Sequence, residues 1–204
     1  MFAVEIPPAV MGFLAVHRAL RAETATIEAL ARTGRTGQAR RRARLLARVL
    51  GHHHNAEDTL LWPTLLERAP HLGATLARLE QDHVELDDLL ARLPDDLDLA
   101  GAVRTRLDGH LAAEEEHALP IWLAAFSPAE HERFAATLRR STPLRDAGLM
   151  ISWLLDHAPA GMAELATGHL PAPLRLAHQL WWRRTYQWRW GSQEPDAVMG
   201  AAYA

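Results

Sequence analysis

Two segments of the sequence repeat one pattern: HHHNAEDTLLWP at residues 52–63 and HLAAEEEHALP at residues 110–120. In each, a histidine precedes a glutamate by four residues, and a proline follows the glutamate six residues later. The pairs are His53 with Glu57 and His110 with Glu114. Residues four apart lie one turn apart on the same face of an α-helix, so each pair can bind one side of a metal centre. The repeat therefore predicts two facing helices with a polar site between them.

Apolar residues recur every three or four positions through most of the chain, which indicates helices. Turn signals divide this pattern into four long segments, at about Pro8–Arg32, Gln38–Ala69, His71–Leu93 and Leu97–Phe126. Pro63 and Pro120 should kink or locally unwind the second and fourth segments. Because the turns are too short for a crossover, we predict an all-α fold with an up-down-up-down antiparallel four-helix bundle.

We expect three units along the chain: the bundle at residues 8–126, a helical appendage packed on it at 127–190, and a flexible tail at 191–204. A capping box at Ser127–Glu130 and the pair Thr142-Pro143 start additional short C-terminal helices. The appendage has no polar constellation of its own, and His131, His157, His169 and His178 receive no role. Its Trp- and Arg-rich end should pack over the bundle, with a membrane-surface or partner-binding helix as the alternative.

The composition excludes several chemistries. The 204 residues include no cysteine and, since all 22 basic side chains are arginine, no lysine. Thiolate metal sites, thiol nucleophiles, Walker A loops and Schiff-base enzymes are therefore excluded. A net charge of -3 gives no general case for nucleic-acid binding. No segment is apolar enough to span a membrane and no secretion signal is visible, so we expect a cytoplasmic protein. The arginine-only, alanine-rich usage suggests a GC-rich bacterial genome.

Histidine is abundant, with twelve copies, and two more of them lie on the inward seams. His17 on the first helix and His83 on the third should reach the level of the two His–Glu pairs. A buried, unpaired carboxylate costs several kcal/mol, so positive charge is expected among them. Imidazole and carboxylate ligands suit iron, manganese or zinc. The predicted metal ligands are His17, His53, Glu57, His83, His110 and Glu114.

Together these motifs resemble those of hemerythrin-like proteins with an HHE cation-binding domain, over roughly residues 8–126. The resemblance implies a centre of two iron ions with an oxo or hydroxo bridge, carboxylates that bridge or cap the irons, and the six ligands named above. Zinc and manganese rank below iron. Oxygen-carrying relatives use five histidines, with an HxxxH pair on the third helix. This chain offers His83 with Asp87 or Leu79 there, so a fifth histidine is missing.

Three alternatives stay open around this site. His54 and Asp58 form a second one-turn pair about 100° around the helix from the first, although the matching prolines favour His53 and Glu57. His117 lies on the inward seam as a candidate support for the ligands, an extra ligand or a proton donor. A ferritin-like centre could use Glu80-x-x-His83 and Glu114-x-x-His117, but it needs an inward glutamate on the first helix, and Glu23 and Glu28 miss that seam.

The function expected from this resemblance is a non-haem di-iron protein that reacts with or senses O2, NO or peroxide. Two alternatives remain: a peroxide-decomposing or oxidase-like enzyme, and a non-catalytic protein that binds metal or a partner. The expected partners are therefore the small molecules O2, NO or H2O2, and no nucleic acid.

Overall fold

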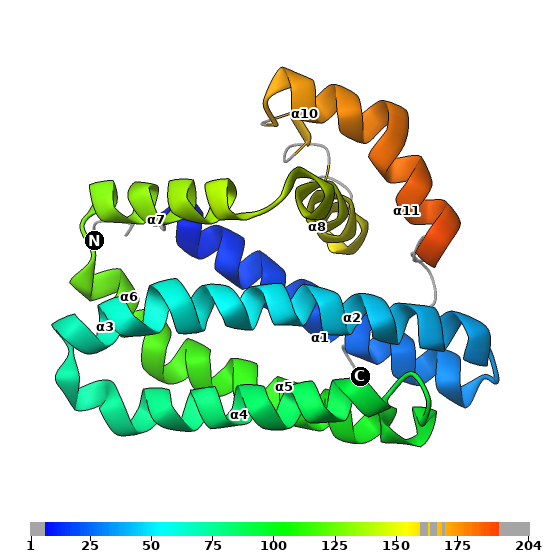
Figure 1. Cartoon of the computed structure of the whole chain (residues 1–204), viewed down its shortest axis with the longest axis horizontal. Coiled ribbons are helices and arrows are strands. Elements are labelled where there is room, and N and C mark those ends of the chain that lie inside the picture. The colour runs from blue at the N-terminus through cyan, green and yellow to red at the C-terminus, as the bar shows by residue number, and fades with distance from the viewer. Residues whose placement is uncertain (1–6, 160–162, 164–166, 169, 192–204) are drawn as a thin grey trace.

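The computed structural model describes residues 7–159, 163, 167–168 and 170–191, and within these ranges it contains helices and no strand. Four long helical segments form an antiparallel bundle (Figure 1). The segments begin with α1 (Pro8–Arg32), α2 (Thr36–Ala56), α4 (Gly73–Arg92) and α5 (Ala100–Ala113). The short 3-10 helices η2 (Pro70–Leu72) and η3 (Leu97–Leu99) precede α4 and α5. The predicted all-α bundle is therefore confirmed.

The second and fourth segments each contain one π-helical stretch, η1 (Glu57–Leu61) and η4 (Glu114–Ala118). The segments continue as α3 (Trp62–Arg68) and α6 (Leu119–Ala125). The amides that follow the two stretches, of Trp62 and Leu119, donate to carbonyls five residues earlier, those of Glu57 and Glu114. The expected local disruption near Pro63 and Pro120 is confirmed, since proline has no amide hydrogen for the regular helical bond.

Each π-helical stretch adds a residue to its turn and moves the inward face by one position. After Glu57, the buried residue is Leu61, where α-helical spacing predicts Leu60. After Glu114, Ala118 is buried and His117 is exposed. The prediction that His117 lies on the inward seam is thus wrong, because it assumed an uninterrupted α-helix.

Two apolar clusters fill the bundle above and below a polar layer. One contains Leu20, Leu46, Leu86 and Leu107, and the other contains Val10, Leu79 and the two large rings of Trp62 and Trp122. Along each long segment, the polar residues predicted to bind metal lie at the boundary between these clusters. The packing on both sides therefore holds the polar layer in place.

Shorter helices follow the bundle: α7 (Pro128–Ser141), α8 (Leu144–His157), α10 (Ala172–Ala177), η5 (His178–Trp182) and α11 (Arg183–Trp190). The predicted capping box at Ser127 is present. Both α7 and α8 pack on α1, while α11 packs on α2 and α8 (Figure 1). None of the helices in the described ranges is both long and apolar enough to cross a membrane. His169 and the predicted tail, apart from Gly191, lie outside the described residues.

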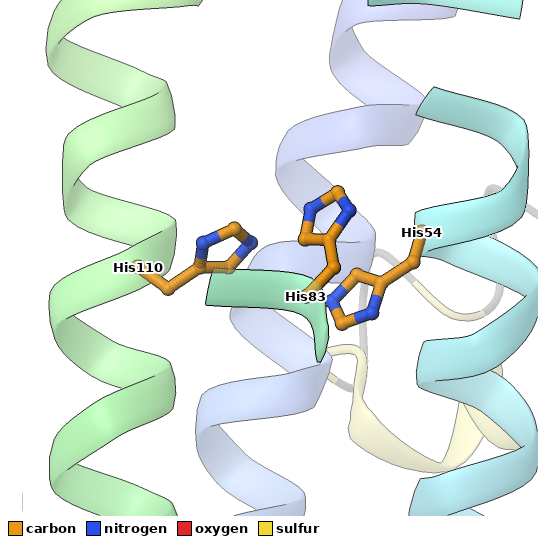
Figure 2. Close-up of side chains that lie close together, drawn as sticks. All are labelled: His54, His83 and His110. Atoms are coloured by element: carbon orange, nitrogen blue, oxygen red, sulfur yellow. The ribbon is translucent and has the colours of Figure 1, made fainter. Parts of the chain in front are cut away.

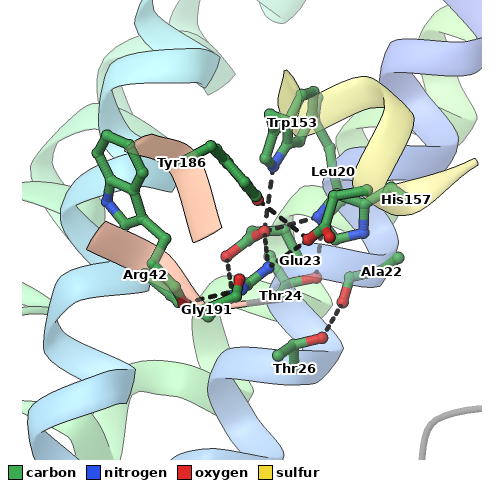
Figure 3. Close-up of polar contacts among 12 residues, drawn as sticks. Leu20, Ala22, Glu23, Thr24, Thr26, Arg42, Trp153, His157, Tyr186 and Gly191 are labelled. Atoms are coloured by element: carbon green, nitrogen blue, oxygen red, sulfur yellow. Dashed lines mark hydrogen bonds and ion pairs between the residues drawn. The ribbon is translucent and has the colours of Figure 1, made fainter. Parts of the chain in front are cut away.

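A buried polar cluster joins α8 to the bundle (Figure 3). Arg42 donates two hydrogen bonds to the Glu23 carboxylate, from Nε at 2.7 Å and from Nη2 at 2.8 Å. Trp153 Nε1 donates to Glu23 Oε2 at 3.0 Å, and His157 Nε2 lies 2.7 Å from the same oxygen. The expectation that the appendage has no polar constellation is therefore wrong. Glu23 does miss the metal-facing seam, as predicted, because it faces α8 instead.

Candidate metal centre

Three imidazoles from three helices meet on one side of the polar layer (Figure 2). They are His54 on α2, His83 on α4 and His110 on α5, and all three are buried. The rings of His54 and His83 stack with centroids 3.8 Å apart and an angle of 9° between planes, while the rings of His83 and His110 lie 4.8 Å apart. One nitrogen of each lies within 4.8 Å of the others, which is close enough for one metal ion.

A second group lies beside the first. It combines His17 on α1 with His53 on α2 and with the carboxylates of Glu57 and Glu114, all buried. Each contributes a ligand atom within 4.8 Å of the others. Since His53 and His54 are consecutive on one helix, α2 contributes one imidazole to each group.

The two carboxylates lie between the groups. Glu57 Oε1 is 3.3 Å from Nε2 of His53, while its other oxygen is 3.7 Å from Nε2 of His83. Glu114 Oε2 is 3.3 Å from Nε2 of His17, and Oε1 is 3.1 Å from Nε2 of His110. Each carboxylate thus directs one oxygen to each group.

The atoms that face the centre have no hydrogen-bond partners among the described residues. This holds for both carboxylate oxygens of Glu57 and of Glu114, and for the inward Nε2 atoms of His17, His53, His54, His83 and His110. Buried polar atoms are normally paired, and an unpaired buried charge costs several kcal/mol. Metal ions would satisfy all of these atoms together, so the residues present fit a metal centre.

Electrostatics also favour a cation. Burial lowers the pKa of His53 to about 3 and that of His54 to about 2, so both imidazoles are neutral, the form that binds metal. Burial raises the pKa of Glu57 well above its usual range, and the neighbouring Glu114 carboxylate raises it further. Burial would also raise the pKa of Glu114, but the imidazoles of His110 and His83 outweigh it and hold it well below. Both carboxylates can be ionised together at neutral pH only if positive charge lies between them, and a metal ion would supply it.

Outer carboxylates orient the ligand imidazoles. Nδ1 of His17 donates to Glu115 at 2.9 Å, and Nδ1 of His83 donates to Asp58 at 2.9 Å. Asp82 lies 3.7 Å from Nδ1 of His110, and Asp87 lies 3.4 Å from Nδ1 of His54. The two hydrogen bonds fix the tautomers of His17 and His83, so that Nε2 carries the lone pair, and they make each imidazole a stronger ligand. Nδ1 of His54 and of His110 has no hydrogen-bond partner among the described residues. Asp58 therefore supports His83, and both Asp58 and Asp87 stand outside the two groups.

All six residues predicted as metal ligands lie together in this layer. His54, which pattern analysis left open, joins them and supplies the fifth imidazole. His117 is exposed and does not reach the centre. Glu80 is exposed too, so the ferritin-like alternative loses one residue from each of its two ExxH pairs. The feature of the sequence that could have predicted two groups beside one helix is the adjacent pair His53 and His54.

Comparison with known families agrees with this geometry. Residues 12–122, more than half of the chain, match the family model "Hemerythrin HHE cation binding domain". The chain belongs to the hemerythrin HHE cation-binding family. It is also 26% identical over 170 residues to "Zinc finger protein BRUTUS" of Arabidopsis thaliana, an alignment that covers 74% of this chain and 14% of that relative. No solved structure is a significant match.

Family membership and side-chain geometry point to the same layer. The matched region of the hemerythrin domain runs from α1 to α6 and contains every member of both groups. The α7–α11 helices lie beyond it, so the polar cluster around Glu23 joins the hemerythrin domain to a part of the chain that the family model does not cover. The chain therefore belongs to a cation-binding family, and the part of it that the family model matches contains both groups of candidate ligands.

Proposed function

We propose that the centre holds two iron ions and that the protein reacts with or senses a small molecule such as O2, NO or peroxide. The observation that carries the proposal is the division of the ligands. Five imidazoles fall into a group of three and a group of two, and Glu57 and Glu114 direct one oxygen to each group. Histidine with carboxylate, and few histidines per ion, is a ligand set that suits non-haem iron.

The unequal groups indicate where a small ligand would bind. His54, His83 and His110 offer three imidazoles, whereas His17 and His53 offer two. The second group therefore leaves more coordination positions open when the carboxylates are shared equally. An iron ion held by this group would supply a change of oxidation state and an open position for a diatomic ligand or peroxide. The surrounding apolar rings, including Phe13 at 4.0 Å from the His17 ring, keep bulk water away.

The first experiment is elemental analysis of protein purified without added metal, together with its absorption spectrum. We expect about two irons per chain, with absorption bands of bridged ferric iron. After reduction, addition of NO or O2 should give a new spectrum that reverses when the gas is removed. Zinc, or a spectrum without such bands, would contradict the proposal and favour a non-catalytic metal-binding role.

A matched pair of variants assigns the metal to this site. Glu114→Ala removes a shared carboxylate and should lose most of the iron, because both groups lose an oxygen ligand. Glu116→Ala, two residues away and exposed, should keep the iron content of the wild type. Equal iron content in the two variants would show that the metal is bound elsewhere.

The enzyme alternative is tested on the same protein by oxygen evolution from hydrogen peroxide. His117 was a candidate proton donor for that reaction, and it is exposed away from the layer. We therefore rank ligand binding or sensing above peroxide decomposition.

A further inference from the structure

The C-terminal helical segment at residues 172–190, which includes α10, η5 and α11, has one face against the protein and one face bare. On the packed face, Tyr186 is buried and its hydroxyl donates to Asp156 at 3.2 Å. The Trp182 ring lies against Gly148, where an added Cβ would be 2.7 Å from the ring. Arg42 Nη1 donates to the carbonyl of Trp190 at 3.3 Å. The segment is thus held in a fixed orientation, and its outer face is a defined surface.

The bare face carries large apolar side chains that water would not favour. Trp188 is 85% exposed and Trp181 is 71% exposed, and Leu180 and Leu176 are 63% and 56% exposed. Leu176 and Leu180 lie two residues on either side of buried His178, and Trp188 lies two residues after buried Tyr186, so all three lie on the side of the helix away from the packed face. A large exposed apolar patch usually marks a site that binds a protein, a membrane or a ligand.

Arginines alternate with these apolar residues. Residues 172–191 contain Arg175, Arg183, Arg184 and Arg189 and no aspartate or glutamate. Arg183 and Arg184 are exposed, and neither forms an ion pair with any residue in the described ranges. The local charge is therefore strongly positive on a protein whose net charge is negative. This surface complements an anionic partner.

We propose that this face binds the surface of a membrane that contains anionic lipids. Tryptophan is the side chain most suited to the boundary between headgroups and acyl chains, and arginine can contact phosphates while its stem remains in apolar surroundings. A helix with aromatic and leucine residues among arginines lies in that boundary with its axis parallel to the membrane. Leucines at Leu176 and Leu180 favour lipid over nucleic acid, since they offer bases no stacking surface.

Flotation of the full-length, metal-loaded protein with lipid vesicles tests the proposal. We expect binding to vesicles of phosphatidylcholine mixed with phosphatidylglycerol, and little binding to phosphatidylcholine alone. Binding should weaken as salt is raised, because salt screens the arginines from the headgroups. Tryptophan fluorescence should shift to shorter wavelength on binding, since Trp181 and Trp188 leave water.

Two variants and a control make the test specific. The double variant Arg183→Gln with Arg184→Gln should weaken binding to anionic vesicles by about tenfold or more. Trp181→Ala with Trp188→Ala should abolish the fluorescence shift. The control, Arg139→Gln with Arg140→Gln at two exposed positions of α7, makes the same change of charge and should bind as the wild type does. All three should keep their metal, because none of these residues lies near the metal centre.

Several results would overturn the proposal. They are absence of binding to anionic vesicles, equal binding by the wild type and the two test variants, and tighter binding to a single-stranded oligonucleotide than to vesicles. A concentration-dependent dimer that the tryptophan variant abolishes, measured by sedimentation, would instead assign the face to a second copy of the chain.

Discussion

His53 and His54 are neighbours in sequence, yet their imidazoles belong to different groups of the metal centre. A step of one residue turns an α-helix by 100°, and α2 runs along the boundary between the two groups. The fifth imidazole of the candidate site thus lies on the second helix, whereas the resemblance to oxygen-carrying hemerythrins implies a fifth histidine on the third helix.

Replacement of His54 tests this assignment. His54→Ala removes one of three imidazoles from its group and should reduce the bound iron from about two per chain to about one, with the group around His17 still occupied. His52→Ala is the matched control, since His52 precedes the pair, is partly exposed and belongs to neither group. Elemental analysis of both purified variants gives the answer; full iron content in His54→Ala would contradict a role as ligand.

At this scale the sequence predicts much of the site. Six residues singled out from spacing and resemblance lie together in one buried layer. His54 was not among the six predicted ligands for two reasons. Helical periodicity defines a helix face only to within about one residue, and the matching prolines favoured the register that contains His53. The His54 ring faces His83 and His110 from the edge of α2. To predict this, one must know where α4 and α5 lie, and the sequence of α2 does not contain that information.

At the scale of the helical elements, the π-helical stretches shift the inward face of two helices by one residue. Glu57 and Glu114, the two candidate carboxylate ligands, are the first residues of the π-helical stretches η1 and η4. Isolated π-helical turns often occur at functional sites, since the extra residue re-aims the side chains that follow. Here the extra residue lets Trp62 and Trp122 fill the core below the centre while both HxxxE pairs keep regular α-helical spacing.

Two single-residue deletions distinguish the effect of the extra π-helical residue from the effect of the spacing between His110 and Glu114. Deletion of Glu116 removes the extra residue of η4, which should become a regular α-helical turn, and Trp122 should stay buried. Metal binding should survive this change. Deletion of Ala112, also exposed and also two residues from Glu114, breaks the spacing between His110 and Glu114 and should release metal.

Circular dichroism and iron content distinguish the two deletions. Similar helicity with iron lost only after deletion of Ala112 is the expected result. Loss of iron after deletion of Glu116 would mean that the π-helical stretch itself positions Glu114. The matching pair in the second segment, Thr59 and Asn55, allows the comparison to be repeated.

Sequence analysis predicts that Pro63 and Pro120 disturb their helices, and the structure agrees. It does not predict the form of the disturbance. A missing amide can lead to a kink, a gap or a π-helical turn, and packing against neighbouring helices selects among them. An uninterrupted α-helix places Leu60 and His117 on the inward face, whereas the structure places Leu61 and Ala118 there.

At the scale of the whole molecule, the Glu23 cluster connects the bundle to the helices that follow it. Burial would raise the pKa of Glu23, but Arg42 and His157 outweigh it and lower the pKa to about 2. The carboxylate is therefore ionised and depends on its partners. His157 is separated from it by 134 residues, a distance at which sequence patterns carry no contact information. This is why the cluster could not be predicted.

Replacement of Arg42 tests whether the buried Glu23 carboxylate depends on its guanidinium partner. Arg42→Met leaves the Glu23 charge buried without its guanidinium partner and should lower the free energy of unfolding by about 3–5 kcal/mol. Arg41→Met, at the exposed neighbouring position, should change it by less than about 0.5 kcal/mol. Urea denaturation of both variants measures the difference. Equal stability would show that the cluster contributes little.

The candidate metal ligands come from all four long segments at one level, and this has a consequence for how an ion would leave. His17 on the first segment and Glu114 on the fourth belong to one group, so a metal ion held by them would cross-link the two ends of the bundle sequence in a chain with no cysteine. The candidate ligands are buried on every segment. Release of the ion would therefore require the helices to separate, and the rate of that opening would set the lifetime of the bound ion more than the strength of any one bond.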